Sequence, residues 1–249
     1  MKHILKYTFS VLIILVSLNS NAQEKIVNDS TEVKKDSVSP KKERFGIRFG
    51  VDLFKLTRSF YEKEYRGIEL VGDFKLTRRH YIAVELGNEN KTVDDDRINF
   101  TTQGTYIKAG FDFNAYENWL GMENMIYVGL RYGVSSFSQQ RNSYEIYNRD
   151  SYFGVAPEII DGEKFSGLSA QWIEVVAGFK AEVYKNIYLG ISLRVNRLMS
   201  NKKPENFDNL YIPGFNRTYN GDFGVGFNYT VSYFLPLYKT TIKAKEKKK

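Results

Sequence analysis

Large apolar side chains alternate with small or polar ones near the C-terminal end of the chain, over residues 222–234. In a β-strand successive side chains point to opposite faces, so this segment is predicted to be a strand with one apolar and one polar face. The apolar face consists of Phe223, Val225, Phe227, Tyr229, Val231 and Tyr233. The polar face consists of Gly224, Gly226, Asn228, Thr230 and Ser232. Such a strand separates an apolar from a polar environment.

The same two-faced pattern occurs in seven earlier stretches, which gives eight predicted strands. They are 45–56, 66–77, 80–91, 103–114, 124–139, 169–184, 187–199 and the segment 222–234. Short or moderate connections follow the second, fourth and sixth strands, at 78–79, 115–123 and 185–186. Longer connections follow the others, at 57–65, 92–102, 140–168 and 200–221. This rhythm predicts an all-β fold, an antiparallel up-and-down eight-stranded transmembrane β-barrel with short periplasmic turns and long outer loops.

Charged residues on the polar faces favour the membrane barrel over its alternative, a soluble periplasmic lipocalin-like carrier with the apolar face inside. Ions in a closed lumen must be paired, because an unpaired buried ion costs several kcal/mol. The set is nearly balanced and forms a predicted lumen network of Arg48, Lys75, Lys108, Arg131, Lys180 and Arg194 with Asp52, Glu69, Asp73, Glu85, Asp112, Glu174 and Glu182. Eight strands leave an interior that side chains can fill, so a diffusion pore is not predicted.

Aromatic residues make up 15% of the chain and gather near the ends of the predicted strands. Amphipathic rings settle at the level of lipid headgroups, which predicts two girdles around a membrane barrel. The periplasmic girdle is predicted from Tyr81, Tyr116, Trp119, Tyr184, Tyr188, Phe234 and Tyr238. The outer girdle is predicted from Phe60, Tyr61, Tyr65, Phe100, Tyr144 and Trp172.

The N-terminal segment, residues 1–22, has the build of a secretory signal peptide, with Lys2 and Lys6 before an apolar stretch and a small-residue site ending at Ala22. A retained anchor is the alternative, but the apolar stretch at 7–18 is shorter than the roughly 20 residues that span a bilayer. We therefore expect four segments: a signal peptide (1–22), a flexible periplasmic lead-in (23–43), a barrel (44–238) and a basic C-terminal tail (239–249).

The net charge of +7 belongs to the two ends of the chain, since the signal peptide and the tail are basic while residues 23–43 and 44–238 are each neutral. A nucleic-acid-binding face is therefore not predicted. The chain has no cysteine, which excludes a lipoprotein anchor, disulfides and thiolate metal sites.

The last strand carries Gly226, Tyr229 and Val231 in a Gly-x-x-apolar-x-apolar pattern that resembles the assembly signal of outer-membrane barrels. With the strand count and the loop rhythm, residues 44–238 resemble the small outer-membrane β-barrels of Gram-negative bacteria, of the OmpA-transmembrane and OmpX kind, and among them an uncharacterised family of unknown function. The resemblance implies insertion by the barrel assembly machinery, with outer-membrane lipid and lipopolysaccharide as neighbours. The family pattern ends at a terminal aromatic residue, whereas here eleven residues follow Tyr238.

Candidate chemistry is sparse. Lipid-modifying barrels of similar size need a His base near a Ser, and the histidines here are His3 in the signal peptide and His80 beside the turn at 78–79, with no Ser paired by a motif. No catalytic residue, cofactor or metal site is predicted. The acidic run 94–96 is either a solvated loop or a divalent-cation site, although its spacing does not fit an EF-hand.

The long loops and the tail are the remaining candidates for interactions. The loops carry Tyr144, Tyr147, Tyr152, Phe153, Phe207, Tyr211 and Phe215, which either contact an extracellular partner or glycan or fold over the barrel mouth as a plug. The basic tail either contacts anionic groups in the periplasm or is a solubilising end.

The function predicted from these observations is that of an integral outer-membrane β-barrel with a charge-paired, filled lumen. It is expected to be a non-catalytic structural or interaction protein of the cell envelope, exported through its signal peptide. The alternatives are a lipid-modifying outer-membrane enzyme and the soluble periplasmic carrier.

Overall fold

The computed structural model describes residues 41–116, 122–146, 157–205, 208–217 and 222–242. Its elements are β1 (Lys41–Asp52), α2 (Leu53–Tyr61), β2 (Tyr65–Lys75), β3 (His80–Asp95), β4 (Ile98–Asn114), β5 (Met125–Tyr144), β6 (Ile159–Tyr184), β7 (Ile187–Lys202) and β8 (Phe223–Ile242). The predicted signal peptide, most of the predicted lead-in and the end of the basic tail lie outside the described residues. No helix in the described part of the chain is long and apolar enough to cross a bilayer.

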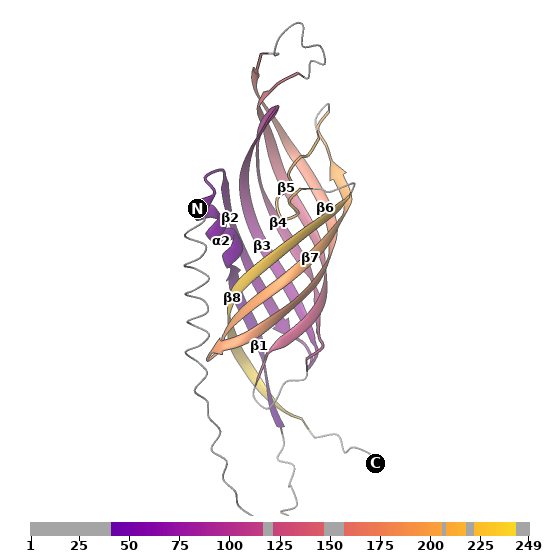
Figure 1. Cartoon of the computed structure of the whole chain (residues 1–249). Coiled ribbons are helices and arrows are strands. Elements are labelled where there is room, and N and C mark those ends of the chain that lie inside the picture. Colours follow the sequence, from indigo (N-terminus) through magenta and orange to yellow (C-terminus); the bar gives the residue numbers. More distant parts are fainter. Residues whose placement is uncertain (1–40, 117–121, 147–156, 206–207, 218–221, 243–249) are drawn as a thin grey trace, which may run out of the picture. The chain divides into compact units, whose positions relative to one another are not determined.

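The eight strands form one closed antiparallel barrel in which every strand pairs with its neighbours in sequence. The ring is closed by β8, which pairs with β1 from Lys41↔Ile242 to Asp52↔Thr230. Figure 1 shows the strands running obliquely around the barrel. Along the length of β1, closure leaves the sheet with no edge strand. The prediction of an all-β, up-and-down, eight-stranded antiparallel barrel is confirmed.

The two ends of the barrel differ. At one end lie the start of β1, the end of β8 and the connections at 76–79, 115–124 and 185–186; we call it the turn end. At the opposite end, which we call the loop end, lie α2 and the connections between β3 and β4, β5 and β6, and β7 and β8.

Several strands run further toward the loop end than predicted. The predicted loop at 92–102 is wrong, because β3 and β4 stay paired from Lys91↔Thr102 to Asp95↔Ile98 and only residues 96–97 connect them. This part of the ladder includes the polar pairs Thr92↔Thr101 and Asp94↔Asn99, and the hydroxyls of Thr92 and Thr101 lie 2.9 Å apart. The apolar alternation stops before the hydrogen-bonded ladder does, so the sequence pattern underestimates the length of these strands.

The segment after β1 also departs from prediction. A strand is predicted as far as Leu56 and a loop from there to 65, but β1 ends at Asp52 and α2 begins at Leu53. The carboxylate of Asp52 accepts a hydrogen bond of 2.8 Å from the amide of Phe54, which is the contact of an N-cap residue. This cap starts a helix where the apolar alternation alone predicts more strand.

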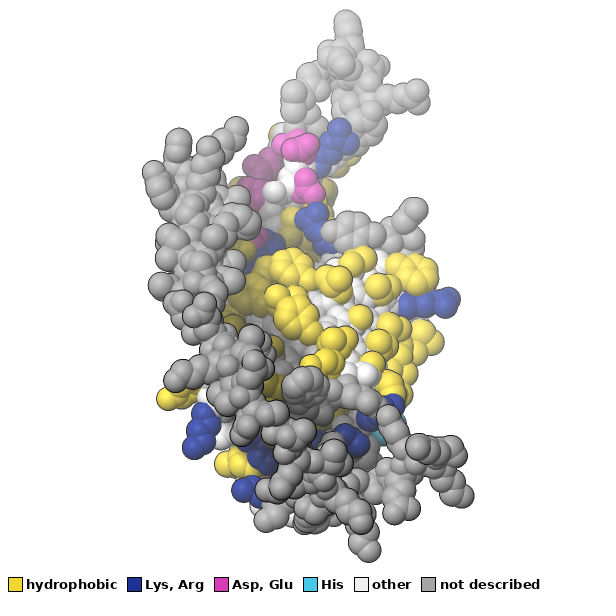
Figure 2. All heavy atoms as spheres, turned by 60° about the horizontal axis from the view of Figure 1, so that its bottom comes forward, with side chains coloured by type: hydrophobic (Ala, Val, Ile, Leu, Met, Phe, Trp, Pro, Cys, Tyr) yellow, Lys and Arg dark blue, Asp and Glu magenta, His cyan; other side chains and the backbone are white. Residues whose placement is uncertain are grey.

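The outer face of the barrel wall is apolar and the inner face is polar, as β7 illustrates. Ile191, Leu193 and Val195 have exposed fractions of 48%, 64% and 52%, whereas the intervening Ser192 and Arg194 are buried at 5% each. Figure 2 shows hydrophobic side chains spread over the visible part of the wall, with charged side chains toward its two ends. The soluble-carrier alternative requires the opposite arrangement, with the apolar face inside.

The predicted aromatic girdles are wrong in part. Six of their members are buried: Tyr65, Tyr81, Phe100, Trp172, Tyr188 and Phe234. On β3, Tyr81 and Glu85 are an even number of residues apart, so both side chains point into the lumen. The other described members are exposed or half-buried, and Trp119 lies outside the described residues.

Candidate functional site

The middle of the lumen holds a network of ion pairs that joins opposite walls of the barrel. Arg194 on β7 makes two hydrogen bonds, of 2.6 and 3.1 Å, with the carboxylate of Glu85 on β3. The same guanidinium lies 3.2 Å from Glu174 on β6. Lys108 on β4 lies 3.2 Å from Glu174 and 3.5 Å from Glu85. Since all four side chains are buried, these pairs hold the lumen closed at this level.

Arg131 on β5 belongs to the same central layer. Its guanidinium lies 2.7 Å from Asp112 on β4 and 3.5 Å from Glu85. It also donates to the backbone carbonyls of Phe111 and Leu130, at 3.0 and 3.2 Å. The charge is therefore surrounded by acceptors, which is the condition for a buried ion to be tolerated.

A second layer of charges lies toward the turn end. Asp73 on β2 accepts a hydrogen bond of 2.6 Å from Lys180 on β6 and lies 3.6 Å from Arg48 on β1. The guanidinium of Arg48 is 4.4 Å from the centre of the Tyr188 ring, so an aromatic face supplies part of its solvation. Lys75 completes this layer through an ion pair of 2.7 Å with Glu123.

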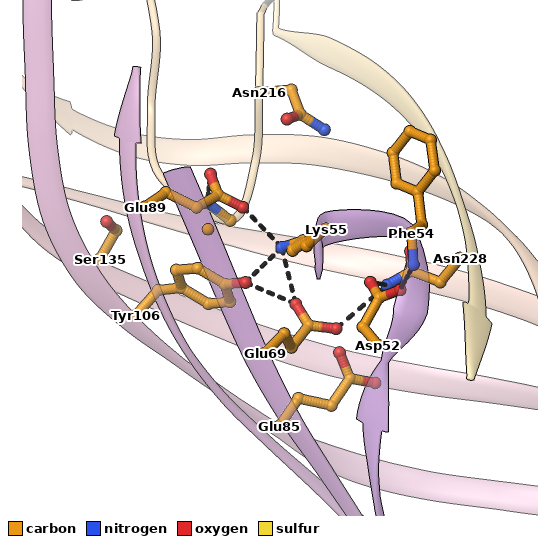
Figure 3. A network of polar contacts seen from close by, with 12 residues as sticks. Asp52, Phe54, Lys55, Glu69, Glu85, Glu89, Tyr106, Ser135, Asn216 and Asn228 are labelled. Carbon is orange, nitrogen blue, oxygen red and sulfur yellow. Dashed lines mark hydrogen bonds and ion pairs between the residues drawn. The ribbon is translucent and has the colours of Figure 1, made fainter. Parts of the chain in front are cut away.

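The third layer, at the loop end, is organised around Lys55 of α2 (Figure 3). Its ammonium group is 2.8 Å from Glu69 and 2.6 Å from Glu89 and also contacts the hydroxyl of Tyr106. Tyr106 in turn donates a hydrogen bond of 2.5 Å to Glu69. Asn228 on β8 donates to Glu69, at 3.0 Å, and to Asp52. A lysine from a helix in the barrel wall thus pairs with two lumen carboxylates.

The connection between β7 and β8 closes the loop end. Tyr211 donates a hydrogen bond of 2.7 Å to Glu89, and the amide of Gly214 donates to the same carboxylate oxygen at 3.1 Å. Phe215 is fully buried and its ring stands edge-on to Trp172 at a centroid distance of 5.8 Å. The loop aromatics are expected from the sequence either to contact a partner or glycan or to fold over the barrel mouth as a plug, and Tyr211 and Phe215 fit the plug. Tyr147, Tyr152, Phe153 and Phe207 lie outside the described residues.

The thirteen residues of the predicted lumen network all lie on the inner face of the barrel. Eleven are buried: Arg48, Asp52, Glu69, Asp73, Lys75, Glu85, Lys108, Asp112, Arg131, Glu174 and Arg194. Lys180 and Glu182 are partly buried, with side-chain exposures of 13% and 23%. The structure brings most of them into the three layers, while Glu182 lies near the turn end and contacts Tyr188 and the amide of Asn186.

Sequence reasoning missed Lys55, Glu89, Glu123 and Tyr106 as lumen residues. Glu89 could have been found, because it continues the inward-facing register of Glu85 on β3. Lys55 could not, since a lumen position for it depends on the helix that replaces the predicted strand.

Other candidates from the sequence have local partners. His80 is exposed at the turn end, 2.9 Å from the hydroxyl of Thr77 and edge-on to Phe113. In the acidic run, Asp94 accepts a hydrogen bond of 3.0 Å from Asn99. Among the residues that the structure describes, no group of three His, Asp or Glu side chains is arranged to hold a metal ion. Gly226, Tyr229 and Val231 lie in β8, each partly exposed.

Comparison with known proteins gives a family and one match to a solved structure. A family model described as a domain of unknown function, DUF6048, matches residues 4–240. The crystal structure of Ail, the attachment invasion locus protein of Yersinia pestis, matches with a TM-score of 0.37 and 13% identity, over 79% of this chain and 99% of Ail. No curated protein matches the chain. Neither match identifies a functional residue in this chain.

Proposed function

The chain belongs to the DUF6048 family, and from its barrel we propose that it is an integral outer-membrane β-barrel of the cell envelope, with a filled lumen and a structural or interaction role. The observation that carries this proposal is the distribution of side chains across the wall. Leu70, Phe111, Leu130 and Phe179 are about half exposed on four different strands, while the ionised residues are inside. An apolar surface that surrounds the barrel wall is unfavourable in water and matches the hydrocarbon of a bilayer.

The side chains that fill the lumen favour a structural role for the barrel rather than that of a pore. Ion pairs cross it at three levels, and Ile212 and Phe215 are fully buried at the loop end. An eight-stranded barrel is narrow enough for side chains to fill. We therefore expect no ion conductance above background when the purified barrel is reconstituted in a planar bilayer, and stable unit conductance steps would contradict the filled lumen.

The loop end is the part proposed to meet an extracellular partner or glycan. The long hairpin of β5 and β6 projects there with Ile160 at 85% and Ile146 at 60% exposure. Ion pairs between Arg141 and both Asp161 and Glu163 brace the hairpin. Exposed apolar side chains on a braced hairpin are suited to recognition.

A non-catalytic role is part of the proposal. His80 is exposed and contacts Thr77 and Phe113 rather than a serine. We expect His80→Ala to leave the lipid A profile of cells unchanged relative to the unaltered protein, as measured by mass spectrometry. A changed acylation pattern in the His80→Ala strain alone would favour the lipid-modifying enzyme instead.

The experiment that tests the proposed location is membrane fractionation combined with a heat-modifiable gel shift. We expect the chain in the outer-membrane fraction, resistant to carbonate extraction, and migrating faster unboiled than boiled. Release without detergent would overturn the membrane location.

A further inference from the structure

At the loop end, one part of the barrel wall is formed by a helix instead of a strand. β1 pairs with β2 only from Ile47↔Phe74 to Val51↔Leu70, and with β8 only as far as Thr230. Beyond these points, β2 continues to Tyr65 and β8 to Phe223 without β1 between them, and α2 contacts both. A helix therefore replaces the missing part of β1 in the wall.

The helix is attached differently on its two sides. Toward β2, the hydroxyl of Ser59 accepts a hydrogen bond of 2.9 Å from the amide of Gly67 and lies 3.3 Å from its carbonyl. Toward β8, α2 makes side-chain contacts: the ring of Phe54 is 4.4 Å from that of Phe227, and Thr57 hydrogen-bonds Tyr229. The contacts between α2 and β8 thus join side chain to side chain, whereas Ser59 reaches the backbone of β2.

A cavity of about 750 Å³ lies at this seam. Its inner lining includes Arg58, Lys91 and Arg217, and its outer lining includes Phe54, Val225 and Phe227. Val225 and Phe227 pair with Val195 and Leu193 and are exposed on the outer wall. The cavity therefore extends from the mouth of the barrel to the apolar outer surface.

Six basic side chains line the cavity, against two acidic ones, Glu64 and Asp94. Arg58 and Lys91 both pair with one carboxylate, that of Glu62. Arg217 is exposed and makes no ion pair with any described residue. An anion among these three side chains would be stabilised by each of them.

We propose that this cavity binds an amphiphile of the outer leaflet, with its anionic head group among Arg58, Lys91 and Arg217 and its acyl chain lying against the outward-facing Val225 and Phe227. An open strand edge is tolerated at membrane depth where it lines a polar cavity, which fits β8 at this seam. The inference rests on the proposed membrane location, which places Val225 and Phe227 in contact with lipid.

Photoaffinity labelling of the whole chain in phosphatidylcholine nanodiscs tests the site. The probe is lysophosphatidic acid with a photoactivatable group in its acyl chain, and labelled peptides are mapped by mass spectrometry. We expect labelling concentrated in the peptides of α2 and β8, suppressed by excess dodecyl phosphate and not by inorganic phosphate or dodecyl maltoside. Suppression by inorganic phosphate would mean a free-anion site and would overturn the amphiphile.

Matched variants separate the head group from the chain. Arg217→Gln and Lys91→Gln should each weaken labelling about tenfold, since a charge-assisted hydrogen bond contributes roughly that factor. Arg197→Gln, which removes an exposed charge on β7 outside the cavity lining, should leave it unchanged. Gly226→Leu adds bulk where a Cβ would have only Asn216 at 4.0 Å, so it should block labelling without removing a charge.

Labelling is scored only on protein that shows the heat-modifiable shift, so a folding defect is not read as lost binding. Equal labelling around the whole barrel, or equal labelling by a photoactivatable phosphatidylcholine, would overturn the site. If the barrel has inserted into the nanodisc, either of these two results contradicts the lipid site but not the proposed membrane location.

Discussion

At the scale of single residues, Glu89 connects three parts of the loop end that are distant in sequence. It pairs with Lys55 of α2 and accepts hydrogen bonds from Tyr211 and from the amide of Gly214, all within 3.1 Å. A carboxylate can accept from several donors at once, so this one position fixes both the helix and the connection between β7 and β8.

The substitution Glu89→Gln tests that position. It keeps the shape of the side chain but removes the charge that Lys55 and Tyr211 share, so we expect faster hydrogen exchange in α2 and in residues 208–217 with the barrel strands unaffected. The cost should be about 1.5–3 kcal/mol, as for a hydrogen bond to a charged group. Glu163→Gln, in the outer hairpin, is the control, and equal protection in the two variants would contradict the role given to Glu89.

Arg131→Leu tests the charged lumen. Removing one member of a buried ion pair leaves Asp112 without its cation and should lower the free energy of unfolding by about 3–5 kcal/mol. The measurement is urea unfolding of the barrel in lipid vesicles, with the heat-modifiable gel shift as the readout of the folded fraction. Arg197→Leu, on the exposed face of β7, should change stability by less than about 0.5 kcal/mol. Similar losses from both would mean that Arg131 is not held in a buried network.

The sequence predicts inward-facing residues well where strand register alone decides. The charges of Glu85, Arg131 and Arg194 alternate with apolar residues, and the structure places each of them in the lumen. The same register argument places Tyr81 and Tyr188 in the lumen, whereas their residue type alone predicts a place in the girdles. Composition suggests where aromatic residues are favourable, but strand register determines which face they occupy.

At the scale of elements, α2 is the feature that the sequence pattern conceals. The alternation of β1 runs through Leu53, whereas Phe54 and Leu56 are out of phase with it, and the cap at Asp52 turns the chain into a helix. The alternation of apolar residues in such a short segment does not distinguish a strand from one side of a helix. What fixes the helix is tertiary: Lys55 reaches Glu69 and Glu89 in the lumen, and Ser59 reaches Gly67 on β2.

Ser59→Ala tests the attachment of α2 to β2. The amide of Gly67 loses its acceptor, so its hydrogen exchange should accelerate and stability should fall by about 1–3 kcal/mol. Hydrogen exchange followed by mass spectrometry or NMR gives the readout. Thr57→Ala, which loses a contact with β8, should leave the protection of Gly67 unchanged. If Gly67 stays protected in Ser59→Ala, the hydroxyl is not its partner.

At the scale of the whole molecule, the barrel has its ions inside and its apolar side chains outside. The number of strands, their antiparallel order and the inward set of charges could be predicted from the sequence, because all three follow from alternation and loop rhythm. The reach of the strands beyond residue 91, the helix in the wall and the plug at Phe215 could not, because they depend on contacts between distant segments.

The most direct test of the outward apolar face uses NMR of the unaltered chain in nanodiscs. Nuclear Overhauser effects from lipid acyl protons should reach the methyl groups of Ile191, Leu193 and Val195, which are about half exposed or more. The side-chain amides of Asn196 and Asn228, which are buried in the lumen, should show none. Acyl contacts at the two asparagines, or their absence at the three methyl-bearing residues, would contradict the account.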